Sequence, residues 1–95
     1  MEVRGKKYEV LDPSEVTVRQ GKNLLMVINA YADYVDAKPE EEEAKYQKLK
    51  PLWKTLTAGV IKNTDSVVQD IDNLTAAQYS EFISSFFPQP SEAKQ

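Results

Sequence analysis

The sequence predicts a mainly α fold, namely a small helical domain of four to five helices with a short N-terminal β-hairpin or strand pair. Apolar residues recur three and four positions apart through most of the chain, which is the period of an amphipathic helix. Two Thr-x-x-Gln sequences match the capping box found at helix starts. Only the first residues combine β-forming side chains with a turn signal. We therefore expect one domain over residues 1–87 and a disordered polar tail over 88–95.

The N-terminal segment 2–11 is expected to form the strand pair. Val3, Tyr8 and Val10 favour extended structure, and Gly5-Lys6 marks the turn between two short arms. Two short strands are only marginally stable in water. This unit must therefore pack on the helices or pair with a strand of another chain.

The first helix is expected over about 18–37, with Ser14 or Thr17 as its cap; Thr17 and Gln20 match a capping box. Helical spacing places four apolar side chains on one face: Leu24, Ile28, Tyr31 and Val35. Further apolar residues widen that face: Leu25, Val27 and Tyr34. A helix that is apolar over so much of its circumference lies at the centre of the fold or contacts a second chain.

The middle of the chain predicts two more helices. Lys38-Pro39 interrupts the first, and Pro39 suits the first position of a new helix, whose positive end Glu40–Glu43 would stabilise. A separate helix is expected over about 51–62, where Trp53 falls on the apolar face and Gly59 is a weak point. Its apolar repeat comprises Leu49, Trp53, Leu56 and Val60.

Two helices are expected after Asn63. A short one is capped by Thr64 or Asp65 and carries Val67, Val68 and Ile71. The last begins at a capping box of Thr75 and Gln78 and is stopped by Pro88. It carries one aromatic face made of Tyr79, Phe82, Ile83, Phe86 and Phe87.

Histidine and cysteine are both absent from the chain. This removes Ser-His-Asp and Cys-His catalysis, Cys/His zinc sites and thiol redox chemistry. The densest remaining set of proton-transfer groups comprises Tyr31, Asp33, Tyr34 and Asp36. Because such carboxylates are commonly the polar edge of an amphipathic helix, we expect no enzyme, no catalytic residue, no cofactor and no metal.

Net charge and hydropathy argue against nucleic acids and membranes as partners. Twelve basic and fifteen acidic residues give a net charge of -3, which disfavours nucleic-acid binding. The longest apolar run, residues 24–28, is too short to cross a membrane, and no apolar signal segment follows the first residues. A cytoplasmic protein is expected.

A protein partner is the function class that the pattern favours. The strand unit, the apolar central helix and the aromatic terminal helix either cover one another in one compact core or leave a surface for another protein. We therefore expect protein binding, with homo-oligomer formation as one outcome. The candidate partner-binding residues are Leu24, Ile28, Tyr31, Tyr79, Phe82 and Phe86.

The layout resembles a known family. The segment Gly5–Val10 (GKKYEV) followed by a helical body looks like small tail assembly chaperones of long-tailed bacteriophages, and Leu74–Ile83 (LTAAQYSEFI) is similar to their late helix. The resemblance covers most of the chain. It implies a non-enzymatic helper in the bacterial host cell that binds and solubilises the tape-measure protein, self-associates, and exists in a second, longer form made by ribosomal frameshift.

Two other functions stay open. Acidic residues favour an inhibitor of the anti-nuclease or anti-CRISPR type that imitates DNA; they are Glu40–Glu43, Asp65, Asp70 and Asp72. Packing of the helices into a ring would instead make the chain a structural head–tail connector subunit. An inhibitor would bind with steep salt dependence, a connector would form a discrete oligomer, and a chaperone would bind apolar helices with little salt dependence.

Overall fold

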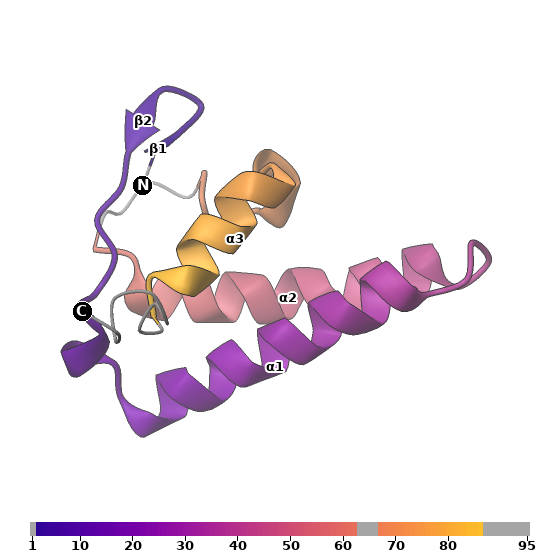
Figure 1. Cartoon of the computed structure of the whole chain (residues 1–95), viewed down its shortest axis with the longest axis horizontal. Coiled ribbons are helices and arrows are strands. Elements are labelled where there is room, and N and C mark those ends of the chain that lie inside the picture. The colour runs from indigo at the N-terminus through magenta and orange to yellow at the C-terminus, as the bar shows by residue number, and fades with distance from the viewer. Residues whose placement is uncertain (1, 63–66, 87–95) are drawn as a thin grey trace, which may run out of the picture.

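The computed structural model describes residues 2–62 and 67–86. Its elements follow in the order β1 (Glu2–Val3), β2 (Lys6–Lys7), the 3-10 turn η1 (Pro13–Glu15), α1 (Val18–Asp36), α2 (Glu42–Val60), the 3-10 turn η2 (Ile71–Asn73) and α3 (Ala76–Ser84). Figure 1 shows α1 and α2 side by side as a hairpin, with α3 lying across it and the connecting end extending beyond α3. The mainly helical class with a strand pair is confirmed, but the described residues form three α-helices rather than four to five.

The N-terminal hairpin turns at Arg4 and Gly5, one residue earlier than expected. Both residues have positive φ, 51° and 80°, which is the backbone pattern of the type I′ turns that two-residue hairpins prefer. The strands pair antiparallel, with Glu2 opposite Lys7 and Val3 opposite Lys6. Val3 is fully buried, so the hairpin packs on the helices of its own chain.

Backbone pairing continues the N-terminal segment onto the end of α2. The Leu11 amide donates to the Val60 carbonyl at 2.9 Å, and the Lys62 amide donates to the Glu9 carbonyl at 2.9 Å. These bonds close an isolated antiparallel bridge between Val10 and Ile61. The start of the chain is thereby attached to the helical hairpin.

α1 begins at the predicted capping box. The Thr17 amide donates to Gln20 Oε1 at 2.8 Å, and the Gln20 amide donates to Thr17 Oγ1 at 3.2 Å. The buried face runs through Leu24 and Val27, whereas Val35 is 59% exposed. The expected apolar stripe is therefore wrong at Val35, because the last turn of α1 extends beyond α3 (Figure 1).

Two predictions about the middle of the chain are wrong at α2. Pro39 lies in the turn before α2 rather than at the first helical position, and the helices expected from Pro39 and over 51–62 are one continuous helix. Pro51 lies inside it. Proline at this position cannot donate to the carbonyl of Gln47, which is an exposed residue that water can reach. Burial of the helix on both sides of Pro51, through Leu49 and Trp53, offsets the missing bond.

The segment before α3 also differs from expectation. Residues 67–70 form turns and Ile71–Asn73 a 3-10 turn, so the expected short helix through Val67, Val68 and Ile71 is wrong there. Its expected caps, Thr64 and Asp65, lie outside the described residues. Trp53 Nε1 donates to the Val68 carbonyl at 2.7 Å and holds this segment against α2. The buried Trp side chain therefore fixes a stretch with little regular structure.

α3 begins at the second predicted capping box, formed by Thr75 and Gln78. Its aromatic face points inward: Tyr79 is 8% exposed, Phe82 1% and Phe86 8%. Of the two alternatives left by the sequence, the compact core is the one observed for this face. Phe87 and the expected tail over 88–95 lie outside the described residues.

Candidate functional site

Seven aromatic rings form a continuous row through the molecule. Neighbouring ring centroids lie 4.1 to 6.4 Å apart, within the range at which aromatic pairs attract. In spatial order the rings belong to Tyr46, Tyr34, Tyr31, Tyr79, Trp53, Phe82 and Phe86. This aromatic row begins at half-buried tyrosines and ends at buried phenylalanines, and each end borders a cavity.

The phenylalanine end borders the apolar groove, a cavity of about 530 Å³. It lies between η1, the first two turns of α1 and Phe86. Its lining consists of Pro13, Val16, Thr17, Val18, Gly21, Lys22, Leu24, Leu25 and Phe86. Val18 is 93% exposed and Leu25 57% exposed, so large apolar side chains face solvent at this groove.

The tyrosine end borders a smaller cavity of about 180 Å³, here named the tyrosine hollow. α1, α2, η2 and α3 all contribute to it. Its lining consists of Tyr31, Tyr34, Tyr46, Ile71, Leu74, Thr75, Ala76 and Tyr79. Four phenol rings from three helices therefore surround one small space.

The carboxylate of Asp72 and the ammonium group of Lys50 lie beside the tyrosine hollow. The Tyr46 hydroxyl donates to Asp72 Oδ1, and Lys50 Nζ lies 2.8 Å from Asp72 Oδ2. Burial, followed by the hydrogen bond to Asp72, raises the pKa of Tyr46 well above its ordinary value. Burial, with the neighbouring Tyr31, raises the pKa of Tyr79 to about 12. Both phenols therefore stay protonated at neutral pH.

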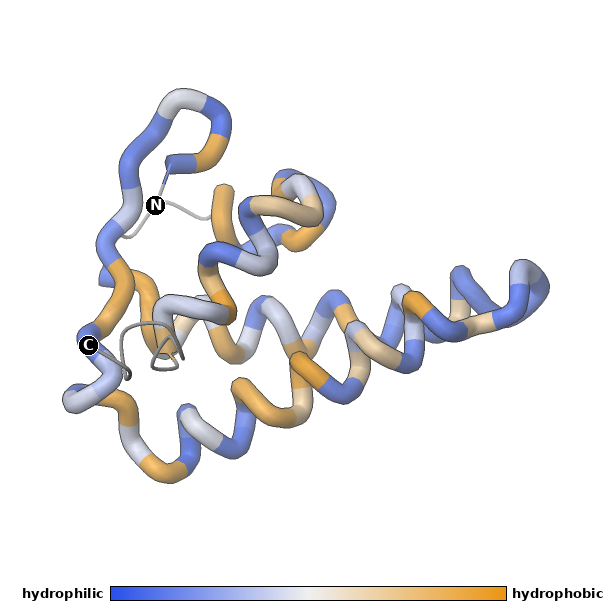
Figure 2. Tube along the Cα trace, viewed as in Figure 1, coloured by the Kyte–Doolittle hydropathy of each residue, from blue (hydrophilic) through white to orange (hydrophobic). Residues whose placement is uncertain are grey.

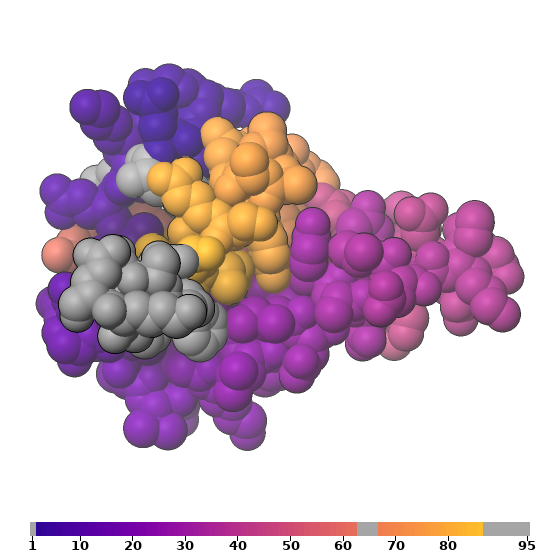
Figure 3. Space-filling model, in the orientation of Figure 1, coloured from indigo at the N-terminus to yellow at the C-terminus, as the bar shows by residue number. Residues whose placement is uncertain are grey.

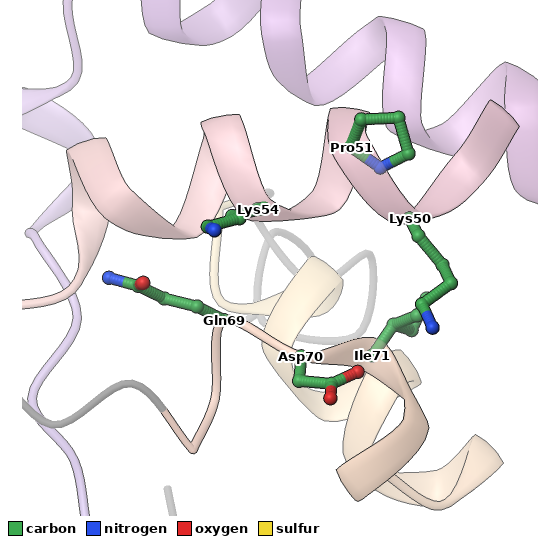
Figure 4. A pocket seen from close by; sticks show the side chains of 6 residues that line it. All are labelled: Lys50, Pro51, Lys54, Gln69, Asp70 and Ile71. Carbon is green, nitrogen blue, oxygen red and sulfur yellow. The ribbon is translucent and has the colours of Figure 1, made fainter. Parts of the chain in front are cut away.

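A third cavity, of about 370 Å³, is lined by both polar and apolar side chains. Figure 4 shows the Lys50 side chain reaching from α2 toward Asp70 and Ile71. Lys54 and Gln69 complete its polar lining. Lys50 is paired with Asp72, so the amino group that reaches this cavity already has a partner in its own chain.

The structure divides the six predicted partner-binding residues between different environments. Leu24 and Phe86 border the apolar groove, and Tyr31 and Tyr79 border the tyrosine hollow. Ile28 packs half-buried against the core. Phe82 is buried between Trp53 and Phe86 and reaches neither cavity. The six residues therefore form no single surface.

Sequence reasoning missed several lining residues. Pro13, Val16 and Val18 of the apolar groove were not expected as binding residues, although Val18 stands two turns before Leu25 on the same helix. Tyr46 of the tyrosine hollow was also missed. Its signal was a lone tyrosine near the start of the helix that follows Tyr31 and Tyr34, which a helical hairpin brings opposite them.

The tyrosine–aspartate set considered for catalysis is divided between two environments. Asp33 and Asp36 are exposed, while Tyr31 and Tyr34 turn toward the hollow. Within residues 2–62 and 67–86, no group of three or more acidic side chains is arranged to hold a metal ion. The same residues contain no helix that is both long and apolar enough to span a bilayer.

Comparisons with family models, curated proteins and solved structures find no match for this chain, so its function is inferred from the two cavities at the ends of the aromatic row.

Proposed function

We propose that this chain is a non-enzymatic protein-binding domain that holds an apolar helix of a partner in the apolar groove. The exposed Val18 and Leu25 beside a cavity of about 530 Å³ carry this proposal. Burying apolar surface contributes a favourable free energy of about 25 cal/mol per Å² removed from water. A partner that covers these exposed side chains would gain this free energy on binding. Contiguous exposed apolar surface commonly marks a binding site.

The shape of the groove favours a helical partner. Val18, Gly21 and Leu25 lie three and four positions apart on α1, so they form one strip along the helix. Nothing lies within 4 Å of the position where a Cβ of Gly21 would stand. A second helix can therefore approach the α1 backbone closely at the middle of the strip, in the helix-in-groove mode.

This binding mode suits the tail assembly chaperone that the sequence resembles. A chaperone of the tape-measure protein must cover apolar helical surface until the tail tube encloses it. We accordingly propose this role, with binding and solubilisation of the tape-measure protein as the activity. We assign client binding to the apolar groove and not to the aromatic face of α3, because that face is buried in the core.

Calorimetric titration with a synthetic amphipathic helical peptide, carrying leucine at helical spacing, tests the proposal. We expect binding with a negative heat-capacity change and little dependence on salt. Leu25→Lys should weaken it by at least about tenfold, since a charge would enter the apolar strip. Val35→Lys is the matched control, because Val35 is equally exposed at 59% but lies outside the groove.

Two results would overturn the proposal. Equal binding by wild type and Leu25→Lys would show that the groove is not the site, and binding lost in moderate salt would favour the acidic inhibitor. Light scattering on the free chain distinguishes the chaperone from a head–tail connector subunit, because a connector subunit would form a ring of discrete mass. A chain ending at Phe86 shows whether residues 87–95, which follow a groove residue directly, compete with the peptide.

A further inference from the structure

The acidic charge of this chain is concentrated at one end of the molecule. Between Tyr31 and Tyr46 the sequence carries six acidic and two basic residues, a net charge of -4, while the whole chain carries -3. These charges lie where α1 connects to α2, and Figure 2 shows this end as mostly hydrophilic. Figure 3 shows the same end projecting beyond α3, accessible to another molecule. It is named the acidic hairpin end below (residues 33–45).

The tyrosine hollow lies beside the acidic hairpin end. Tyr34 stands between Asp33 and Asp36 in the sequence of α1, and Tyr46 follows Lys45 in α2. Their rings are 5.0 Å apart and line the hollow from the two helices. An aromatic surface therefore directly adjoins a stretch of the chain with a net charge of -4.

Size excludes a helix as the occupant of the hollow. Its volume of about 180 Å³ is about a third of that of the apolar groove. It can take one side chain, whereas the groove can take a helix face. The lining carries no charged side chain, so a group bound there would meet ring faces and phenol oxygens.

The electrostatics of the hollow favour a cation. The faces of aromatic rings carry negative potential and attract ammonium and guanidinium groups. The phenols of Tyr46 and Tyr79 stay neutral at physiological pH, and Asp70 adds negative charge near Tyr46, while Asp72 is paired with Lys50. The chain already places one cation on this cluster, since Lys50 Nζ lies 5.8 Å from the centre of the Tyr46 ring.

We propose that the tyrosine hollow and the acidic hairpin end together bind a basic segment of a partner protein, with one arginine side chain in the hollow. Arginine fits better than lysine, because its planar, weakly hydrated guanidinium stacks on aromatic faces while donating to nearby oxygens. Neighbouring basic residues of the segment face Asp33, Asp36 and the glutamates before α2. This inference uses residues outside the apolar groove, so it stands or fails independently of the chaperone proposal.

Calorimetry with a short peptide of three arginines separated by glycine and serine tests this surface on the full chain. The same peptide with citrulline at each arginine is the matched ligand control, since citrulline keeps the shape and loses the charge. We expect the arginine peptide to bind and the citrulline peptide to bind at least about tenfold more weakly. Affinity should fall as salt rises, because part of it comes from the exposed carboxylates.

Variants of one tyrosine separate the hollow from the general acidic surface. Tyr34→Leu should weaken arginine-peptide binding by about tenfold, whereas Tyr34→Phe, which keeps the ring, should bind nearly as wild type. Thermal melting of both variants establishes that the fold persists. Asp33→Asn with Asp36→Asn should reduce the salt dependence of binding.

Three outcomes would overturn the inference. Equal affinity of wild type and Tyr34→Leu would mean that carboxylates alone attract the peptide. Equal affinity for the arginine and citrulline peptides would exclude a cation as the occupant. Acetylated arginine amide binding as tightly as the peptide would mean that the hollow takes a small molecule rather than a protein segment.

Discussion

Tyr31 of α1 and Tyr79 of α3 stack with ring centroids 4.1 Å apart and planes inclined by 20°. The ring centroid of Tyr79 also lies 5.4 Å from that of Trp53 of α2, so this one tyrosine contacts both of the other helices. The same pair borders the tyrosine hollow on one side and the buried core on the other. A change in this stack would therefore affect both the stability of the fold and the shape of the hollow.

Phe82→Ala should destabilise the fold severely. Phe82 is 1% exposed and packs between two other aromatic rings. Its ring centroid lies 5.0 Å from that of Trp53 and 5.3 Å from that of Phe86. Removing such a ring leaves a cavity and costs about 3–5 kcal/mol, out of a total stability of about 5–15 kcal/mol. Urea unfolding followed by the fluorescence of Trp53, the single tryptophan, measures the loss.

The control for that loss is Val35→Ala, at an exposed apolar residue of α1. It should change the free energy of unfolding by no more than about 0.5 kcal/mol. A Phe82→Ala protein that melts like wild type would contradict the core position of α3 and restore its aromatic face as a binding surface.

Stability should fall in alkaline solution as the tyrosines ionise. Unfolded Tyr79 loses its proton near its ordinary pKa of 10.0, but burial, with the neighbouring Tyr31, raises the folded pKa to about 12. Between these values the folded state binds more protons, so unfolding becomes easier as pH rises. The stabilisation is complete below about pH 10 and disappears as the pH passes through about 12. Denaturant unfolding at a series of pH values measures this slope.

Tyr79→Phe isolates that contribution, because phenylalanine keeps the ring and has no proton to lose. The variant should show a shallower fall in stability over the same pH range. A second variant, Asp72→Asn, should lower the pKa of Tyr46 toward its ordinary value by removing the charge that its hydroxyl faces. An unchanged tyrosinate absorbance titration in Asp72→Asn would show that the Asp72 carboxylate does not act on Tyr46 in solution.

Local sequence signals predicted the starts of α1 and α3, but not that of α2. The capping boxes at Thr17 and Thr75 were both found in the sequence and are both present in the structure. Each depends on residues within one turn, so no tertiary information is needed. The same holds for the strand pair, whose turn at Gly5 was displaced by one residue only.

Tertiary burial explains the errors. Pro51 is a strong local signal for a helix boundary, yet burial of Leu49 and Trp53 on either side carries the helix through it. Periodicity likewise located the aromatic face of α3 but could not say what covers it. That answer depends on Trp53 and Tyr31, which are distant in sequence. Both cavities combine residues from several elements, and no local pattern contains them.

Pro51→Ala should stabilise the protein. Alanine restores the amide that can donate to the Gln47 carbonyl and removes a ring that crowds the preceding turn, and Pro51 is exposed, so no core contact is lost. We expect a gain of about 1–3 kcal/mol in the free energy of unfolding. Pro39→Ala is the control, since Pro39 lies in the turn before α2 and should lose a few tenths to about 1 kcal/mol. A loss at Pro51 would mean that α2 depends on a bend at this position.

Gln20→Ala tests a contact in which a capping residue also joins two helices. Gln20 completes the capping box with Thr17, and its Nε2 donates to the Gly59 carbonyl of α2 at 2.9 Å. A Cβ at Gly59 would stand 3.3 Å from that Nε2, so the glycine permits the close approach. Removing Gln20 loses one local and one tertiary hydrogen bond and should cost about 1–2 kcal/mol.

Thr17→Ala, which removes only the cap, should cost about 1 kcal/mol and is the matched comparison. Gln78 repeats the arrangement at α3, where its Nε2 donates to the Glu2 carbonyl of β1 at 3.1 Å. Gln78→Ala should therefore also exceed the cost of a lost cap and should speed amide hydrogen exchange in the N-terminal hairpin. If Gln20→Ala proves less costly than Thr17→Ala in urea unfolding, the bond to Gly59 contributes nothing to the joining of α1 and α2.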